Sequence, residues 1–314
     1  MSAALALLQP ALLVALAPLF SGTIAAIKAR LQMRRGAPVW QRYADLARLF
    51  RKESILSTDA SWLARATPYV VLGASLAVAT WVPVLLTSSP MSFAGDLVMT
   101  VALLALVRVL QALAALEAGT TFGGMAASRH MALAALAEPA LMLSVFTLAI
   151  GAGSTDLARI SRSVAAAPLA WLSPSHLLAL AAMWLVVLSE SGRVPVDNPA
   201  THLELTMIHE GMVLDYSGRH LALLEWAATV RQMVLFTLVA NLFMPWGIAF
   251  EPSGAALGIA FIAWTGKLLA CGVVVALGES LTAKLRLFRV PEFLGMAFLL
   301  SLLALTSDSL LRAP

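Results

Sequence analysis

The chain has 314 residues, of which 60% are hydrophobic and only 12% carry a charge, and its formal net charge is +4. Soluble proteins keep roughly a quarter of their residues charged, whereas apolar runs of about 20 residues, enough to cross a bilayer, recur along this sequence. The composition therefore excludes a soluble globular domain and indicates a protein that crosses a membrane several times.

Each crossing segment is expected to be a helix, because lipid cannot satisfy backbone polar groups and the apolar runs are continuous rather than alternating. The first run has no basic segment before it and is too long for the core of a signal peptide, so we expect it to remain as the first helix. In chain order, the eight predicted spans cover residues 4–27, 67–88, 97–116, 131–152, 174–190, 223–248, 255–278 and 291–311. We predict an all-α membrane protein, a bundle of about eight transmembrane helices forming a single domain over residues 1–314.

The first predicted loop, residues 28–66, contains a basic amphipathic helix. Trp40, Tyr43, Leu46 and Phe50 recur at helical spacing on one face. Such a helix lies at the membrane interface, either on anionic lipid or under a docked protein, and the sequence leaves both readings open. The basic residues predicted to meet a docked partner, including one in the third loop, are Arg34, Arg35, Arg48, Arg51, Lys52 and Arg129.

The basic residues also predict the orientation, since cytoplasmic loops carry an excess of Lys and Arg. The loop over residues 28–66 holds nine of the 21 Lys and Arg residues, and the odd-numbered loops together hold 15. The opposite loops and the C-terminal tail hold three. We therefore predict that the odd-numbered loops face the cytoplasm and that both termini lie outside. The positive charge reflects this orientation and gives no indication of nucleic acid binding.

Four charged residues lie deep inside predicted spans, where an ionisable group is costly and is a functional hypothesis by default. At 1.5 Å per residue, Arg108, Glu138 and Arg231 lie about 10–12 Å below the cytoplasmic ends of their spans, and Lys267 about 16 Å. We expect the four to meet in one layer inside the bundle. They either form ion pairs that fix helix register or line a hydrated chamber that carries protons or binds a headgroup. In the second reading Glu138 exchanges protons.

Three further carboxylates lie nearer the cytoplasmic ends of their spans, namely Glu190, Glu225 and Glu279. They either extend the buried layer toward the surface or snorkel to the membrane interface. Asp308 lies close to the outer end of the last span and is expected to be solvated.

The fifth predicted loop, residues 191–222, concentrates polar residues in an otherwise apolar chain. Pro195 and Pro199 exclude a continuous helix, and Thr201 with Glu204 matches a capping box, so a short helix over about 202–214 is predicted. Two histidines seven residues apart do not match the H-E-x-x-H zinc pattern, so they are expected to titrate or donate hydrogen bonds rather than bind metal. The candidate residues are Arg193, Asp197, His202, Glu204, His209, Glu210 and Asp215.

The sequence carries no sign of chemistry performed by the chain itself. Cys271 is the only cysteine, so the chain alone cannot hold an iron–sulfur cluster, which normally needs about four thiolates. The glycines match neither a P-loop nor a dinucleotide fingerprint, and no nucleophile elbow occurs. We predict no catalytic residue, no metal ligand and no cofactor bound by this chain alone.

Seven motifs, distributed in order over nearly the whole chain, carry a resemblance to a known family. They are A-R-L-Q-M-R-R-G at 29–36, Q-R-Y-A-D-L-A-R-L-F-R-K-E at 41–53, A-A-S-R at 126–129, L-A-E-P at 136–139, E-S-G-R-V-P-V-D at 190–197, D-Y-S-G at 215–218 and G-E-S-L-T-A-K-L-R-L at 278–287. Together they make the chain similar to subunit 1 of respiratory complex I and to its relatives in group 4 nickel–iron hydrogenases. The likeness is greatest to the membrane anchor subunits of formate hydrogenlyase and hydrogenase-4.

The resemblance implies an eight-helix subunit that joins a peripheral electron-transfer arm to ion-translocating membrane subunits. It assigns Glu138 to a charged axis in the membrane, and it places Arg193 and Asp197 in a coupling loop beside a quinone chamber. The family shows a carboxylate-rich run after this aspartate, where this chain reads D-N-P-A-T-H-L-E-L. That difference favours a hydrogenase-like branch over a complex I-type quinone site.

Three functions stay open at this point. The first is a non-redox membrane subunit that anchors the arm and couples redox chemistry to proton or sodium translocation. The second is a quinone-chamber subunit of a quinone-linked oxidoreductase, and the third is a free-standing secondary transporter, whose usual internal repeats are not evident here.

The resemblance also implies partners and a location. The partners are large and small peripheral subunits of hydrogenase or complex I type, antiporter-like membrane subunits and the lipid bilayer. Iron–sulfur clusters and a nickel–iron site would belong to the partners, and a quinone would bind at an interface with one of them. The expected location is the cytoplasmic (inner) membrane of a bacterium or archaeon.

Overall fold

The computed structural model describes residues 3–57, 60–87, 95–167, 172–197 and 207–312. Among these, seven helices are long and apolar enough to cross a membrane, and α7 is a shorter apolar helix. The prediction of an all-α membrane protein is thereby confirmed. The helices are α1 (Ala3–Leu31), α2 (Gln41–Arg51), α3 (Trp62–Trp81), α4 (Leu97–Glu117), α5 (Thr121–Ala152), α6 (Leu157–Ala166), α7 (Pro174–Glu190), α8 (Gly218–Leu238), α9 (Gly254–Leu281) and α10 (Val290–Arg312).

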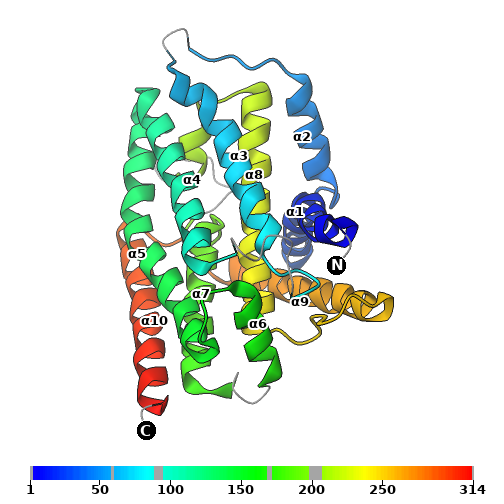
Figure 1. The fold of residues 1–314 in the computed structure, drawn as a ribbon. Coiled ribbons are helices and arrows are strands. Elements are labelled where there is room, and N and C mark those ends of the chain that lie inside the picture. The colour runs from blue at the N-terminus through cyan, green and yellow to red at the C-terminus, as the bar shows by residue number, and fades with distance from the viewer. Residues whose placement is uncertain (1–2, 58–59, 88–94, 168–171, 198–206, 313–314) are drawn as a thin grey trace.

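The helices form one elongated bundle (Figure 1). Helix α5 packs against α4, α7 and α10, and α3 packs against α4 and α8. Helix α9 runs across the direction of α8 and packs mainly against α1. The end that carries α2 and the starts of α3, α5 and α8 is called the basic end below, and the C-terminus lies at the opposite end.

The predicted amphipathic helix of the first loop is α2, and it packs on the outside of α1 and α8. The hydroxyl of Tyr43 donates to the carbonyl of Ala15 on α1, and the ring of Phe50 meets Trp226 of α8 edge to face at 6.4 Å. Part of its apolar face is therefore used within the chain, while Trp40 stays largely exposed.

Several predicted spans differ in position from their helices; the span over residues 131–152, for example, belongs to α5, which begins ten residues earlier at Thr121. The span over residues 67–88 is helix α3, which begins five residues earlier at Trp62 and ends at Trp81. The helix ends there because Pro83 disfavours helical geometry in the residue before it, and Val82 is extended. The chain beyond α3 is therefore irregular where a helix was predicted.

The irregular segment after α3 is buried, yet its backbone is hydrogen-bonded by side chains. The side-chain oxygen of Gln9 accepts from the amides of residues 84–86 at 3.0–3.3 Å. The amide of Asn241 donates to the carbonyls of Pro83 and Val84 at 2.8 and 2.7 Å. These contacts meet the requirement that backbone groups inside a membrane find partners within the protein.

Helix α6 was not predicted, because its ten residues are too short for a span and were read as part of a loop. Its apolar residues Leu157 and Ile160 are buried on one side. Ser161 donates to the carbonyl of Asn241 at 2.7 Å, and Asp156 caps the first turn by accepting from the amide of Ala158 at 3.0 Å. This helix closes the bundle at the end opposite the basic end.

Candidate functional site

Three charged side chains from three helices meet in the bundle, where Arg108 is buried, Glu190 is largely buried and the Glu138 side chain stays 32% exposed. Nη1 of Arg108 on α4 lies 2.8 Å from Oε1 of Glu138 on α5, and its Nε lies 3.2 Å from Oε2 of Glu190 at the end of α7. Arg108 is 2% exposed. One guanidinium, with its fork of donors, thus holds two carboxylates. This part of the predicted layer does come together, and it includes Glu190, for which both a place in the layer and snorkelling had been left open.

The expectation that Lys267 shares this layer is wrong. Its ammonium binds Oδ1 of Asn241 at 2.7 Å and three backbone carbonyls at 2.9–3.1 Å. These carbonyls belong to residues 240, 244 and 246, where α8 ends in a π-helical turn, η4 (Val239–Phe243). The expected depth of Lys267 in the membrane assumes that its helix runs along the bundle. Helix α9 runs across the bundle instead (Figure 1), so the number of residues from its end does not measure depth. Lys267 instead satisfies the carbonyl end of α8.

Arg193 and Glu279 form a second buried ion pair, with Nη1 to Oε1 at 3.5 Å. Lys28, at the end of α1, adds a contact of 2.9 Å to Oε2 of Glu279. When the amide of Gln232 is turned, its oxygen accepts from Nε and Nη2 of Arg193 at 3.1 Å. Burial lowers the pKa of Arg193 and the charge of Glu279 raises it. Glu279 is therefore part of an ion-pair network and does not snorkel to an interface.

Asp197 is the most highly bonded carboxylate of the coupling loop, residues 191–222. Its Oδ2 accepts from the backbone amides of Ile208 and His209 at 3.2 and 3.3 Å, and its Oδ1 lies 2.8 Å from Nζ of Lys284. Burial alone would raise the pKa of this carboxyl, but hydrogen bonds and charge from His209 and Lys284 outweigh it and hold the pKa well below its usual range. Asp197 is therefore ionised and fixes the fold of the loop.

The short helix predicted over 202–214 is not present in the part of the loop that the structure describes. His202, Glu204 and the capping box lie outside the described residues. The described part contains only one 3₁₀ turn, η3 (Glu210–Val213). The turn starts late because Asp197 takes the amides of residues 208 and 209, which a longer helix would have used within itself.

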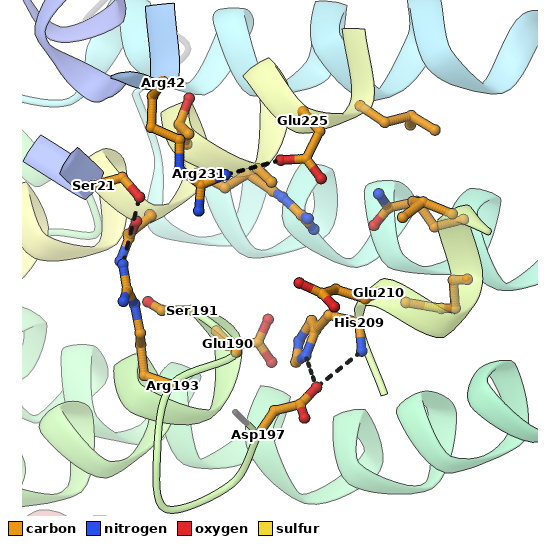
Figure 2. Close-up of a pocket in the computed structure, with 18 residues that line it drawn as sticks. Ser21, Arg42, Glu190, Ser191, Arg193, Asp197, His209, Glu210, Glu225 and Arg231 are labelled. Carbon is orange, nitrogen blue, oxygen red and sulfur yellow. Dashed lines mark hydrogen bonds and ion pairs between the residues drawn. The ribbon is translucent and has the colours of Figure 1, made fainter. Parts of the chain in front are cut away.

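A polar cavity of about 140 Å³ lies above the Arg108 cluster. Figure 2 shows Arg193 with Ser21 on one side of it and Asp197 with His209 on another. Charged residues in its wall that no earlier pair includes are Arg42, Glu210, Glu225 and Arg231. Arg42 and Glu225 approach to 3.4 Å at the mouth. The cavity therefore brings the predicted coupling loop and three members of the predicted charge layer into one site: Glu190, Glu225 and Arg231.

His130 is the residue of this site that sequence reasoning missed. It is buried on α5, 4% exposed, and its ring centre lies 5.0 Å from that of His209 with the planes at 72°. The sequence places it directly after the A-A-S-R motif in an apolar stretch. Only the contact with His209, from a loop 79 residues away, shows that it belongs to the site.

The D-Y-S-G motif, residues 215–218, joins four segments of the chain at the basic end. Asp215 accepts from the hydroxyl of Thr120 at 3.0 Å, which links the motif to the start of α5. Tyr216 donates to the carbonyl of Ala64 on α3 at 3.0 Å. Burial, followed by the charge of Glu117, raises the pKa of Tyr216 to about 12, so its hydroxyl keeps its proton. Asp215 thus has a structural contact outside the cavity.

The second half of the motif holds the segment that follows α2. Ser217 accepts from the amide of Ile55 and donates to its carbonyl, at 2.9 and 3.0 Å. At Gly218 a Cβ atom would lie 2.1 Å from the carbonyl oxygen of Glu53, and its φ is +52°. A glycine is therefore required at this position by space and by backbone conformation.

Most of the basic residues predicted to meet a partner lie on the surface of the described structure. Five of them are exposed: Arg34, Arg35, Arg48, Arg51 and Lys52. Arg129 is half-buried, and its Nη1 donates to the carbonyl of Met207 at 3.4 Å. Within the described ranges no group of three metal-ligating side chains is found.

Comparison with known proteins agrees with this geometry. The chain is 36% identical to hydrogenase-4 component C of Escherichia coli over 300 residues, which is 95% of this chain and 93% of that protein. It is 34% identical to formate hydrogenlyase subunit 4 of the same organism over 98% of this chain and 99% of that one. The fold matches a chain of an archaeal membrane-bound sulfane sulfur reductase with a TM-score of 0.80, at 18% identity, over 96% of this chain and 98% of that one.

The family described as NADH dehydrogenase matches residues 3–307. Two relatives are more than 30% identical to this chain over nearly their full lengths. The ion-pair cluster and the coupling loop both lie inside the region that the family model matches. The chain is therefore a multi-pass membrane protein that belongs to the NADH dehydrogenase family, as a subunit similar to subunit 1 of complex I.

Proposed function

We propose that the chain is a membrane subunit of a complex I-like assembly of the hydrogenase type. It anchors the peripheral electron-transfer arm and helps couple redox chemistry to the translocation of protons or sodium ions. The observation that carries this proposal is Arg108, which is buried and holds Glu138 and Glu190 beneath a charged cavity at 2.8 and 3.2 Å. Buried ion pairs contribute little to stability by themselves, so the cluster supports a role in charge movement.

The chain contributes no redox centre of its own. Its single cysteine, Cys271, is buried in α9, and iron–sulfur clusters need several thiolates. Iron–sulfur clusters and a nickel–iron site would therefore be held by large and small peripheral subunits, as the names hydrogenase-4 and formate hydrogenlyase of two relatives suggest. Antiporter-like membrane subunits would be the other neighbours.

The proposed location is the cytoplasmic (inner) membrane of a bacterium or archaeon, with both termini outside. The last turn of α2 carries the exposed residues Arg48 and Arg51 at the basic end, which the positive-inside rule places on the cytoplasmic side. The peripheral arm would dock there, close to the coupling loop and the cavity.

The first test is purification of the assembly through a tag on this chain. A co-purifying large subunit with two C-x-x-C pairs supports the hydrogenase type, and a chain that purifies alone as an active transporter contradicts the proposal. The second test is Glu138→Gln in the reconstituted complex, with Glu251→Gln as the matched control, since Glu251 is exposed and does not line the cavity. We expect an assembled complex with weaker ion transfer per turnover, and unchanged ion transfer would contradict the coupling role.

Quinone binding is the second candidate function. At about 140 Å³ the cavity is smaller than the roughly 300–1,000 Å³ typical of small-molecule sites, and its described wall is rich in charged groups. A quinone would therefore need additional surface from a partner subunit. Activity of the purified complex in the complete absence of quinone contradicts this alternative.

A further inference from the structure

His130 has a feature that packing alone does not explain. It is 4% exposed, and among the described residues its Nε2 has no hydrogen-bond partner. A buried polar atom without a partner costs stability and is uncommon, so it calls for a specific reason. A proton can be placed on this nitrogen without breaking any existing hydrogen bond.

His209 links His130 to the cavity. The His209 ring lines the cavity and meets the ring of His130 at 5.0 Å. On its other side, Nδ1 of His209 lies 3.6 Å from Oδ2 of Asp197. Gly192, with φ of +59°, makes room for the ring, since a Cβ atom there would lie 3.2 Å from Nδ1. The two imidazoles therefore lead from the wall of the cavity to a buried position on α5.

The charges around the pair determine what protonation does. Burial, His209, Arg231 on α8 and Arg108 on α4 all oppose a positive charge on His130. A positive charge on His130 repels both guanidiniums in a medium of low dielectric constant. Some charged groups face the pair or line the cavity beside it, and others bind these groups. Together they are Arg42, Arg108, Arg129, Glu138, Glu190, Arg193, Asp197, Glu210, Glu225, Arg231 and Lys284.

We propose that His130 and His209 form a proton-accepting pair that controls the hold of Arg108 on Glu138 and Glu190. Water in the cavity supplies the proton, an imidazole nitrogen accepts it, and the same proton returns to the cavity, so no electron changes place. The charged pair weakens the contacts of Arg108 and frees its carboxylates to exchange protons. His130 and His209 act through Arg108 and are positioning residues. This inference rests on the proposed coupling function.

The alternatives predict different behaviour. A metal site is not supported, because within the described ranges no third ligating side chain joins the two histidines. A purely packing role for His130 predicts that any isosteric side chain preserves the pH dependence of ion transfer. Imidazole is the side chain whose charge changes most readily near neutral pH, so a proton-accepting pair predicts that this dependence disappears with either histidine.

The test uses the complete complex reconstituted in vesicles, with His130→Gln, His209→Gln and the double variant. Ion transfer per turnover is measured against pH from mildly acidic to mildly alkaline. We expect each single variant to assemble and to flatten the pH profile. Ion transfer per turnover should fall about fivefold or more, which is the lower end of the coupling typical between two sites. The double variant should be no worse than either single one. His176→Gln is the matched control, because His176 contacts Phe243 at the other end of α8.

Each outcome decides between the readings. If both single variants keep the wild-type pH profile while Glu138→Gln loses ion transfer, the histidine pair is wrong and the proposed function stands. If Glu138→Gln also has no effect, the proposed function itself fails. Losses that multiply in the double variant contradict a pair that acts as one unit. Should His130→Gln not assemble, the half-buried His209 provides the deciding profile.

Discussion

Nζ of Lys284 lies 2.8 Å from Oδ1 of Asp197, and this contact joins the coupling loop to the loop between α9 and α10. A second link runs beside it, because Arg193 of the same motif pairs with Glu279 near the end of α9 at 3.5 Å. Two motifs that are far apart in the sequence are therefore held together by two charge pairs. The cavity lies against the same loop, so its shape depends on both pairs.

The Asp197 carboxylate predicts how the stability of the protein depends on pH. Its pKa in the folded protein is lowered, while an unfolded aspartate has a pKa of about 3.9. A lowered folded-state pKa means that the stabilisation is fully present above about pH 4 to 5 and is lost as pH falls toward the folded-state value. We expect thermal unfolding in detergent to show a smaller loss of stability on acidification for Asp197→Asn than for the wild type. Equal losses would show that other groups dominate.

Removal of Arg108 should affect assembly as well as ion transfer. Arg108→Met leaves Glu138 and Glu190 without their shared partner, and breaking a buried ion pair by removing one side typically costs about 3–5 kcal/mol. We expect a lower yield of assembled complex and a lower midpoint of thermal unfolding. Arg108→Lys is the control, since an ammonium keeps the charge but lacks the fork that holds two carboxylates. Its effect should be intermediate, and a stable Arg108→Met complex would contradict the cluster.

Lys267 should behave differently from the members of the cluster, because it binds carbonyl groups at the end of α8. Lys267→Met removes the hydrogen bonds that the ammonium donates to these carbonyls and to Asn241, and a buried group left unsatisfied costs about 1–3 kcal/mol. We expect less assembled protein, measured by the yield after detergent extraction, while the molecules that do assemble transfer ions normally. A Lys267→Met complex that assembles well but has lost ion transfer would place Lys267 in the ion path.

The D-Y-S-G motif predicts a strong effect from a small substitution. In Gly218→Ala the added Cβ atom would lie 2.1 Å from the carbonyl oxygen of Glu53, in a backbone conformation with φ of +52°. We expect the variant to accumulate poorly in the membrane. Gly124→Ala is the matched control, because nothing lies within 4 Å of its added Cβ atom and alanine is favoured over glycine by about 0.5–1 kcal/mol inside a helix. Similar membrane levels for the two variants would contradict the close contact at Gly218.

The helical type of the membrane-crossing segments followed from the sequence, because long apolar runs must be helical in lipid. The end of α3 at Trp81 was missed although Pro83 marked it, since hydropathy continues past the proline. Helix α6 was missed because ten residues with one buried face do not register as a span. Patterns of hydropathy report burial in lipid, and they are insensitive to short helices that close the end of a bundle.

The candidate site was only partly predictable. The contact of Arg108 with Glu138 follows from their equal predicted depths in helices that run side by side. The same estimate of depth is wrong for Lys267, because α9 lies across the bundle. Contacts that join distant segments, such as His130 with His209, leave no periodic signal in the sequence. In the described part of the coupling loop the predicted helix is replaced by a single turn, because Asp197 binds amides that a propensity argument assigns to the helix itself.

The cluster around Arg108 also restricts how protons enter the interior. Arg108 and Arg231 carry two positive charges, and Glu138 and Glu190 carry two negative ones, so the four groups sum to zero. An extra proton on either carboxylate leaves one uncompensated positive charge on the buried Arg108, which is costly. The cost disappears if another positive charge leaves at the same time or if an electron arrives nearby. A site that is neutral at rest therefore favours exchange of one charge for another over simple uptake.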